Sequence, residues 1–526
     1  MSARRTGSRL RALVVCLTAL CACPLTQAAE STDCARLADF VLPGTRLTIS
    51  KTERIAAGPA AATARGGPAY TGALPARCVV EGVIDQRMGV GGVSYGIHFA
   101  LALPDDWNGR FLFQGGGGLN GSVQPPLGAA AAGETPALAR GFAVVSNDTG
   151  HQGAVFDGSF NADQEAALNF LYAANGKVVP LAKALIDAYY RRPAEHSYFV
   201  GCSTGGREAM MMSQRFPSFF DGIVAGAPAM RTGFSNLGMR AVSVALATVA
   251  ERDADGKVIP GSALSATDKR LIVDGALAAC DAKDGVTDGM IEDPIGCDFD
   301  PAVLTCRSAK KDQCLTRKQV AAVKKAMAGP KNAAGRQVYP GYLYDTGIGA
   351  TARGTLPGVL NGAASPVGPN PPPTQQDVDA EAAVAATATS SLGDTATWTN
   401  LSTFRGHDGK LMFYHGVSDP WFSALDTVRY YRELAEANGG IDATRGFSRL
   451  FLVPGMGHCR GGEATLDRFD MLSAIVEWVE NGQPPASVTA TGASFPGRSR
   501  PLCPYPQHAQ YSGHGDSEQA ANFQCR

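Results

Sequence analysis

The sequence has almost no net charge and no long run of charge of one sign. Its 526 residues include 47 Lys and Arg against 48 Asp and Glu, which gives a formal net charge of −1. Proteins that bind nucleic acids usually concentrate basic residues, so we expect no nucleic-acid partner. Internal repeats are also absent. The apolar content of 45% is typical of a globular protein, and the length allows more than one domain.

The chain also lacks an apolar run long enough to cross a membrane. Residues 13–23 are apolar but too few to span a bilayer. They follow four arginines and precede Ala28 and Ala29, a pattern typical of a secretory signal peptide over residues 1–28. We therefore expect a secreted or periplasmic protein without a transmembrane segment. Lipidation at Cys23 is an alternative, because residues 20–23 resemble a bacterial lipobox.

Beyond the leader the chain lacks the CxxC pairs typical of zinc sites, although it contains many cysteines. Three of the 13 cysteines would leave with the signal peptide, and ten would remain. An even number in an exported protein indicates disulfides rather than scattered free thiols. The ten are Cys34, Cys78, Cys202, Cys280, Cys297, Cys306, Cys314, Cys459, Cys503 and Cys525.

Strand patterns alternate with helical patterns in two parts of the chain, which predicts a mostly parallel, doubly wound α/β sheet. Residues 29–230 would form the first part of this core, with an N-terminal arm up to about residue 80. Residues 399–526 would form the second part. Between them the composition shifts to helical patterns and proline-rich loops, so we interpret residues 231–398 as a large inserted lid domain. The strand patterns cover residues 78–84, 95–101, 107–114, 142–146, 197–202, 222–228, 410–414 and 449–453, and the helical patterns of the core cover 176–190, 207–214, 427–437 and 471–480.

A Gly-x-Ser-x-Gly motif at residues 201–205 stands between a strand pattern and a helical pattern. On such a turn, Ser203 would occupy a strained backbone position at the N-terminus of the helix, where N–H groups stabilise negative charge. Glycines on either side avoid collisions with the neighbouring strand and helix. The motif predicts a nucleophilic serine, but it also occurs by chance, so the rest of the chain must supply the serine's partners.

Residues 115–118 are four successive glycines directly after a strand pattern. Glycines leave the backbone N–H groups uncovered by side chains. In an α/β-hydrolase this loop supplies a donor that stabilises the oxyanion of the reaction. A flexible turn is the alternative interpretation.

An activated serine needs a base and an acid that orients the base. In α/β-hydrolases these follow later strands in the order Asp or Glu, then His, which Asp419 and His458 match. His415 is a rival base, but it precedes Asp419 and we interpret it as structural. Asp426 and Asp467 are alternative acids, which we interpret as residues that begin helices.

Cysteines flank two of these three residues: Cys202 precedes Ser203, and Cys459 follows His458. If the three residues assemble, the two sulfurs could lie within bonding range. A disulfide there would limit drift between two loops that must bring Ser and His within roughly 2.6–3.2 Å. Chance placement of two cysteines at these positions is improbable, so they favour Ser203 as the nucleophile.

The combination Cys202-Ser203, Asp419 and His458-Cys459 resembles the CS–D–HC motif of the tannase/feruloyl esterase family. The resemblance covers essentially the whole chain after the leader. It implies an α/β-hydrolase fold and a Ser203–His458–Asp419 triad. It further implies an oxyanion hole formed by the backbone N–H groups of Gly118 and Thr204, and five disulfides: Cys34–Cys78, Cys202–Cys459, Cys280–Cys297, Cys306–Cys314 and Cys503–Cys525.

The same resemblance implies a structural calcium ion in the lid. The matching segment would supply side chains of Asp281, Asp284 and Asp288 and carbonyls of Val286 and Met290. Carboxylates and carbonyls suit a hard cation, although the spacing is not that of an EF-hand. Without the resemblance, the segment would be interpreted as an Asp/Gly-rich turn.

Two segments supply candidate substrate contacts: the lid stretch at residues 351–359 and the residues that follow Asp419. One branch of the family binds a terephthalate monoester with a tryptophan-rich lid and an arginine that holds the substrate carboxylate. The corresponding stretch here, residues 351–359, is shorter and lacks tryptophan; Arg353 is the counterpart candidate, with a solvated surface arginine as the alternative. Trp421 and Phe422 follow Asp419 and could stack on an aromatic ring, or pack in the core.

The function these features predict is that of a secreted, monomeric serine esterase for aromatic carboxylic esters of the feruloyl, galloyl or terephthaloyl type. Hydrolysis of mono(2-hydroxyethyl) terephthalate specifically is one alternative. Another is a non-catalytic protein that binds an aromatic ligand on a hydrolase scaffold, and a peptidase with the same triad is a third.

Overall fold

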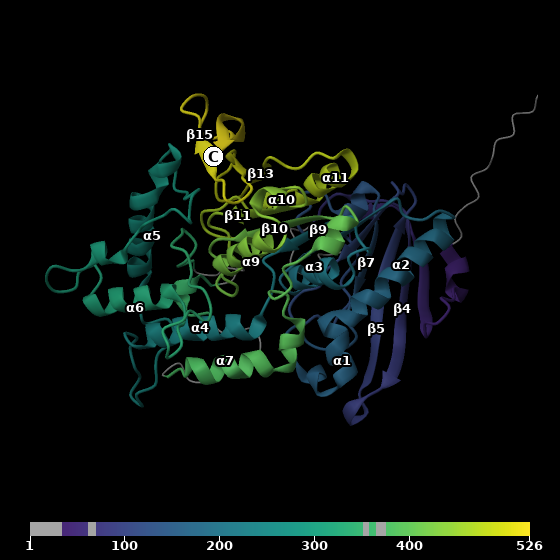
Figure 1. The fold of residues 1–526 in the computed structure, drawn as a ribbon, viewed down its shortest axis with the longest axis horizontal. Helices are drawn as coiled ribbons and strands as arrows, with labels where there is room; N and C mark the ends of the chain where they lie inside the picture. Colours follow the sequence, from purple (N-terminus) through teal and green to yellow (C-terminus); the bar gives the residue numbers. More distant parts are fainter. Residues whose placement is uncertain (1–33, 61–69, 351–356, 364–374) are drawn as a thin grey trace, which may run out of the picture.

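The computed structural model describes residues 34–60, 70–350, 357–363 and 375–526, and its centre is a nine-stranded sheet (Figure 1). The strand order is β1-β4-β5-β7-β6-β8-β9-β10-β11. Strands from β7 to β11 run parallel, whereas β1, β4, β5 and β7 pair antiparallel. The strands are β1 (Leu47–Ile55), β4 (Arg77–Met88), β5 (Ser94–Pro104), β6 (Arg110–Gln114), β7 (Ala143–Asn147), β8 (His196–Cys202), β9 (Gly222–Gly226), β10 (Lys410–Gly416) and β11 (Ser448–Val453).

Helices cover both faces of this sheet, as the alternation of side chains along its strands requires. In β6, Phe111 and Phe113 point to one face and Leu112 to the other. The first face packs against α2 (Ala174–Tyr190), α3 (Thr204–Arg215) and α9 (Ala424–Ala437), and the second against α11 (Met471–Asn481). The predicted mostly parallel α/β sheet is therefore correct, with an antiparallel extension at one edge.

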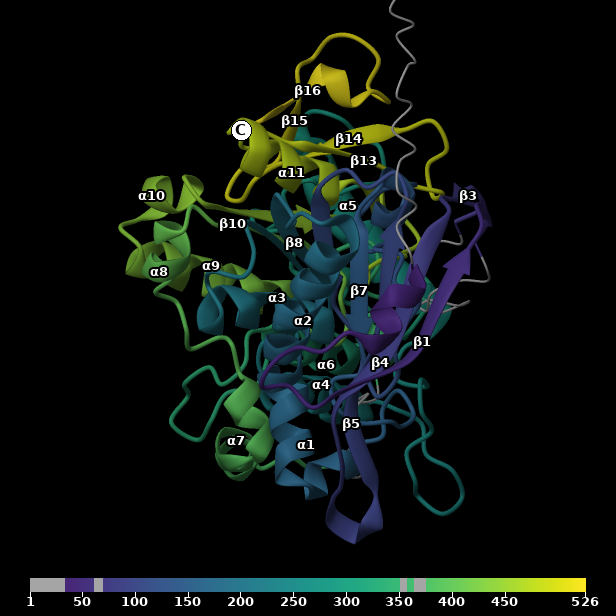
Figure 2. The same cartoon turned by 90° about the vertical axis from the view of Figure 1, so that its right-hand side faces the viewer.

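The N-terminal arm differs from its prediction, because it contributes a strand of its own. β1 pairs antiparallel with β4 and forms the edge of the main sheet (Figure 2). The preceding 3₁₀ turn, Cys34–Asp39, is joined to β4 by the Cys34–Cys78 disulfide. Most of β1 is half-buried or exposed, so its sequence lacks the apolar run that marked the inner strands.

The segment between β9 and β10 is mainly helical and has its own apolar cluster. Figure 1 shows its helices gathered beside the strands of the main sheet. The cluster, which we call the insertion core, draws on buried residues between Val242 and Leu360 and includes no residue of the main sheet. The helices are α4 (Thr232–Ala247), α5 (Ala266–Cys280), α6 (Arg317–Ala328) and α7 (Val378–Thr387).

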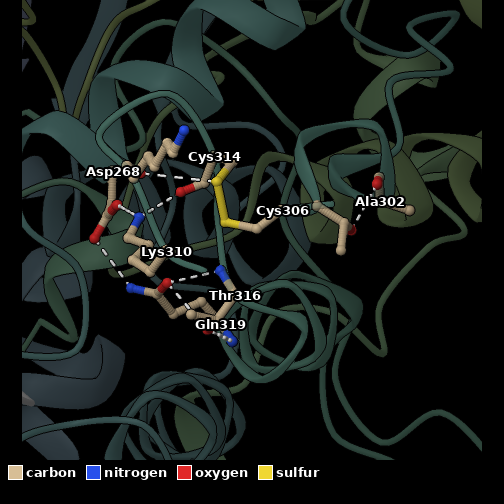
Figure 3. The surroundings of a disulfide bond; sticks show 9 residues. Asp268, Ala302, Cys306, Lys310, Cys314, Thr316 and Gln319 are labelled. Atoms are coloured by element: carbon tan, nitrogen blue, oxygen red, sulfur yellow. Dashed lines mark hydrogen bonds and ion pairs between the residues drawn. A yellow bond between two sulfur atoms is a disulfide. The ribbon is translucent and has the colours of Figure 1, made fainter. Parts of the chain in front are cut away.

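Local polar contacts fix the start of two of these helices. Ser265 and Asp268 form a capping box on α5, and Thr316 and Gln319 form one on α6. Figure 3 shows Lys310 reaching Asp268 beside the Cys306–Cys314 disulfide, while Gln319 donates to the same carboxylate at 3.0 Å. The disulfide loop thereby ties the two helix starts together.

Smaller elements complete the chain. A three-stranded sheet of β12 (Arg468–Phe469), β13 (Val488–Thr491) and β14 (Ser499–Leu502) follows the last core strand. Among the described residues, no helix combines the length and apolarity that a membrane crossing needs. The remaining strands and helices are β2 (Gly58–Pro59), β3 (Ala73–Leu74), β15 (Ala509–Tyr511), β16 (Phe523–Cys525), α1 (Gln164–Leu168), α8 (Ser402–Gly406) and α10 (Ile441–Arg445).

Candidate active site

Ser203 stands on the turn between β8 and α3, with φ of 65° and ψ of −122°. This left-handed conformation is rare for a residue with a side chain. Its N–H donates to Gly226 O at 3.0 Å, which fixes the turn to the neighbouring strand. A Cβ on Gly201 would lie 2.5 Å from Gly205 O, so this glycine is needed for the close approach of strand and helix. A Cβ on Gly205 would lie 2.6 Å from Gly116 O, so the second glycine is needed for the close approach of the helix to the glycine loop.

His458 and Asp419 meet beyond the ends of β11 and β10. His458 Nδ1 lies 2.7 Å from Asp419 Oδ2, and both side chains are buried. Asp419 Oδ1 accepts the backbone N–H groups of Trp421 and Phe422 at 2.9 and 3.1 Å. Burial alone would raise the pKa of Asp419, but the attraction of His458 and hydrogen bonds from His458 and His415 hold it well below its usual range. The acid is thus an ionised carboxylate aimed at one nitrogen of His458.

His458 lines the same cavity as Ser203. Within the described residues, His458 Nε2 is buried without a hydrogen-bond partner. Cys202 and Cys459, the neighbours of Ser203 and His458, form a disulfide with Cα atoms 6.0 Å apart. The structure therefore brings Ser203 and His458 to one cavity while leaving Nε2 open to accept a proton.

The rival residues have other roles in the structure. His415 is fully buried, and its two nitrogens lie 2.8 Å from Thr427 Oγ1 and 2.9 Å from Phe422 O. Asp426 pairs with Arg231, with the shortest N–O distance at 2.6 Å.

Asp467 does not begin a helix, contrary to the prediction. It accepts the N–H of Gly461 at 2.7 Å, and Asp470, three residues later, caps α11 instead. Both Asp467 and Asp470 precede the same apolar helix pattern, but Asp470 directly precedes Met471 and accepts the N–H of Ser473 at 2.9 Å.

The glycine loop lies beside the N-terminus of α3. Gly118 has φ of +60°, and a Cβ there would lie 2.6 Å from Val155 O, so glycine is required. Thr204 is the first residue of α3, where the N–H has no partner inside the helix. Its hydroxyl donates to Gly118 O, so the two predicted oxyanion donors are tied together. Both residues line the cavity.

Glu208 supports this loop and was not singled out from the sequence. It is 2% exposed, and its Oε2 accepts the N–H of Gly116 at 3.0 Å while Oε1 accepts Asn120 Nδ2 at 2.8 Å. Its place in the Gly-Gly-Arg-Glu run after Ser203, one turn into α3, was the available signal.

The cavity itself has a volume of about 790 Å³, a size common for small-molecule sites. Aromatic side chains surround its reactive end. The rings of Trp421 and Phe422 lie 5.1 and 5.2 Å from that of His458, and Phe156 packs edge-on against Trp421. Trp421, Phe422 and Phe156 all line the cavity, whereas Arg353 lies outside the described residues.

All five disulfides implied by the resemblance are formed in the structure. They join Cys34 with Cys78, Cys202 with Cys459, Cys280 with Cys297, Cys306 with Cys314, and Cys503 with Cys525.

The acidic segment expected to bind calcium forms a tight loop after α5. Asp281 accepts the N–H groups of Asp288 and Gly289, and Asp288 also pairs with Arg500. In the described chain, no three His, Cys, Asp or Glu side chains are grouped as metal ligands. Asp284 Oδ2 is nevertheless buried without a partner. Burial, together with the charges of Asp288 and Asp281, raises the pKa of Asp284 to about 6.

α/β-Hydrolases carry out hydrolysis with a serine on a strained turn and a histidine–carboxylate pair that share one site, as Ser203, His458 and Asp419 do here. The chain is a carboxylic ester hydrolase. It belongs to the tannase and feruloyl esterase family, whose model matches residues 78–366 and 371–526.

Individual relatives agree with this assignment. The chain is 39% identical to mono(2-hydroxyethyl) terephthalate hydrolase of Piscinibacter sakaiensis, over 93% of this chain and 90% of that protein. It is 30% identical to feruloyl esterase B of Aspergillus niger, over 80% and 82% of the two chains. The crystal structure of feruloyl esterase B from Aspergillus oryzae superposes with a TM-score of 0.74 at 25% identity, covering 94% of this chain and 99% of that one.

Proposed function

We propose that the protein is a secreted serine esterase that hydrolyses esters of aromatic carboxylic acids. The observation that carries the proposal is the disulfide between Cys202 and Cys459, which holds Ser203 beside the buried His458–Asp419 pair on one cavity. A histidine held against an ionised acid, in the same cavity as a serine, supports catalysis rather than binding alone.

In the proposed reaction, Ser203 Oγ attacks the ester carbonyl carbon while His458 Nε2 takes its proton. Asp419 keeps Nδ1 protonated and stabilises the imidazolium. The N–H groups of Gly118 and Thr204 would donate to the oxyanion of the tetrahedral intermediate. As that intermediate collapses, the C–O bond to the alcohol breaks and His458 returns the proton to the alcohol oxygen. Water then attacks the acyl-enzyme by the same route, releasing the acid and restoring Ser203.

The aromatic rings near His458 support an aromatic substrate. Trp421, Phe422 and Phe156 present apolar faces and edges to a cavity that is large enough for a single-ring ester. Relatives named for feruloyl esters and for a terephthalate monoester support the same class.

We also propose that residues 231–398 form a lid that binds a structural calcium ion. The donor set fits a hard cation, because the segment offers three carboxylates and the carbonyls of Val286 and Met290. The unpartnered oxygen of Asp284 supports this assignment. The ion would be held by Asp281, Asp284, Asp288, Val286 and Met290, and would neutralise clustered negative charge.

Export through the signal peptide at residues 1–28 is supported by the five disulfides, which form and persist in oxidising compartments. A monomeric state completes the proposal and can be measured by light scattering.

The reaction is tested with the p-nitrophenyl ester of an aromatic acid. We expect a burst of p-nitrophenol equivalent to the enzyme, followed by slower turnover, and loss of both in Ser203→Ala. Ser473→Ala, an exposed serine on α11, is the matched control and should keep both phases. Absence of turnover on a broad panel of aromatic esters would contradict the proposal.

A further inference from the structure

The cavity that Ser203 lines is also lined by residues of the segment between β9 and β10. These are Asp394 and Ser390, near the 3₁₀ turn Thr389–Gly393, and Thr232 at the start of α4. Thr395 N donates to Met230 O, and Ala229 N donates to Ser203 O. The segment that carries Asp394 is therefore bonded to the same loop that backs the nucleophile.

Three of the described residues that line the cavity are charged: Arg207, Asp394 and Arg460. Arg460 is exposed to solvent. Arg207 is buried, and its guanidinium donates to Leu171 O and Phe170 O at 3.0 Å each. Arg207 is thus buried and held by two backbone carbonyls, and Asp394 is the half-buried acid among the three charged residues.

The other charges near Asp394 largely compensate one another. Arg231 is held by Asp426 at 2.6 Å, and buried Arg207 is attracted by its buried neighbour Glu208. The positive groups that act on Asp394 are Arg231 and Arg207, with Asp426 opposing them. Among the described residues that line the cavity, Asp394 is the one carboxylate, so it is the group that would act on a polar or charged substituent of a bound ring.

We infer that Asp394 sets the acyl specificity of the esterase: its carboxylate accepts a hydrogen bond from a hydroxyl on the aromatic ring and disfavours a ring that carries a carboxylate. The inference rests on the proposed function. A carboxylate acceptor pairs strongly with a phenolic O–H, because hydrogen bonds to an ionised group are short and strong. A second carboxylate brought to the same place meets repulsion in a partly buried site.

This assignment separates two substrate classes that share the same reacting ester. Hydroxycinnamoyl and hydroxybenzoyl esters would be favoured, and anionic monoesters of terephthalic acid would be poor substrates. Neutral diesters of terephthalic acid have the same ring without the negative charge, and they are the matched comparison.

The test compares wild type with Asp394→Asn at pH 8. Burial raises the pKa of Asp394 to about 7, against the attraction of Arg231 and Arg207, so the carboxylate is ionised at this pH. The probes are methyl 4-hydroxycinnamate, methyl cinnamate, dimethyl terephthalate and mono(2-hydroxyethyl) terephthalate. Asp442→Asn, an exposed acid on α10, makes the same change of net charge away from the cavity and is the control.

We expect Asp394→Asn to raise kcat/KM for the monoester relative to the neutral diester by about ten-fold or more, as removal of a like charge from a partly buried site implies. The preference for the 4-hydroxy ester over methyl cinnamate should fall, chiefly through KM. Asp442→Asn should leave both ratios unchanged.

An unchanged ratio of monoester to diester in Asp394→Asn, with wild type active on the neutral esters, would overturn the inference and leave the proposed function standing. A wild-type preference for the monoester over the diester would overturn it as well. Failure of wild type on all four esters would instead overturn the proposed function.

Discussion

Cys202 and Cys459 are separated by 257 positions in the chain, yet their disulfide joins the two loops that carry Ser203 and His458. Serine and histidine in such sites must stay within hydrogen-bond reach, although they come from different parts of the sheet. The disulfide constrains this separation covalently. Asp419 orients the ring of His458, whereas the disulfide limits the separation of the two loops, so the two restraints are complementary.

Removal of this disulfide should therefore affect both stability and turnover. In the chain-entropy model a loop of this length stabilises the folded state by up to about 5 kcal/mol. We expect the double variant Cys202→Ser/Cys459→Ser to lower both the melting temperature and kcat. The control is Cys306→Ser/Cys314→Ser, which opens a loop with a separation of only 8 and should lower the melting temperature less, with kcat retained. Equal kcat in wild type and the first variant would contradict the role given to the disulfide.

Replacement of the acid tests how His458 is oriented. Asp419→Asn should reduce kcat by about 10³- to 10⁴-fold, because the histidine loses its charged partner and its preferred tautomer. Steady-state kinetics and circular dichroism together separate this effect from misfolding. Asp426→Asn removes the rival carboxylate and should lower stability, through the loss of its pair with Arg231, while kcat stays within about ten-fold of wild type.

Glu208 is expected to position the glycine loop. Glu208→Ala leaves the N–H of Gly116 and the amide of Asn120 without their acceptor, so the loop should lose its alignment with Ser203. Removal of one oxyanion donor costs about 10²- to 10³-fold in kcat in other hydrolases, and we expect a loss in that range with little change in KM. Glu208→Gln, which keeps an acceptor, should recover part of kcat. Equal kcat in the two variants would argue against positioning.

Stability should fall in mild acid because of His151. Burial lowers the pKa of His151 to about 4, while backbone carbonyls of Leu119 and Thr149 oppose the shift only in part. In the unfolded chain His151 binds a proton near pH 6.5, whereas in the folded chain it stays neutral down to about pH 4. The contribution of His151 to the free energy of unfolding is therefore fully present above pH 6.5. It should decline as pH falls from 6.5 to 4, by up to about 1.4 kcal/mol per unit. Urea unfolding at pH 7.5, 5.5 and 4.5 measures the slope, which should be shallower in His151→Gln.

Calcium should stabilise the protein without taking part in the reaction. Chelation is expected to lower the melting temperature, and added calcium should restore it, because the ion would neutralise Asp281, Asp284 and Asp288. Differential scanning fluorimetry on metal-free protein gives the measurement. Asp284→Asn should weaken the response, and identical melting with and without calcium would show that the segment is only an Asp/Gly-rich turn.

Much of the fold was predictable because its inner strands are buried on both faces and therefore have continuous apolar sequences. β6, β7, β8, β9 and β10 belong to this group. The turn at Ser203 was predictable from its Gly-x-Ser-x-Gly motif between a strand pattern and a helical pattern. β1 was missed because an edge strand with one solvent-facing side has a mixed sequence such as Leu47–Ile55.

The parts of the site that the sequence did not indicate depend on tertiary placement. No sequence pattern distinguishes Asp394 from the other acids of the chain. Its position near Ser203 comes from the tertiary hydrogen bond between Thr395 N and Met230 O. Glu208 likewise acquires its role only because Gly116, 92 positions away, offers it an N–H. Neither contact has a local spacing rule, whereas Asp419 and His458 do, since each follows a strand in a known order.

The insertion core has a consequence for how such enzymes can diversify. Its buried residues lie between Val242 and Leu360 and pack mainly among themselves. Ser203, Asp419 and His458 follow strands of the main sheet, whereas Thr232, Ser390 and Asp394 line the cavity from the segment between β9 and β10. Under the proposed function, substitutions in that segment change the substrate preference of the enzyme while the groups that carry out hydrolysis stay the same.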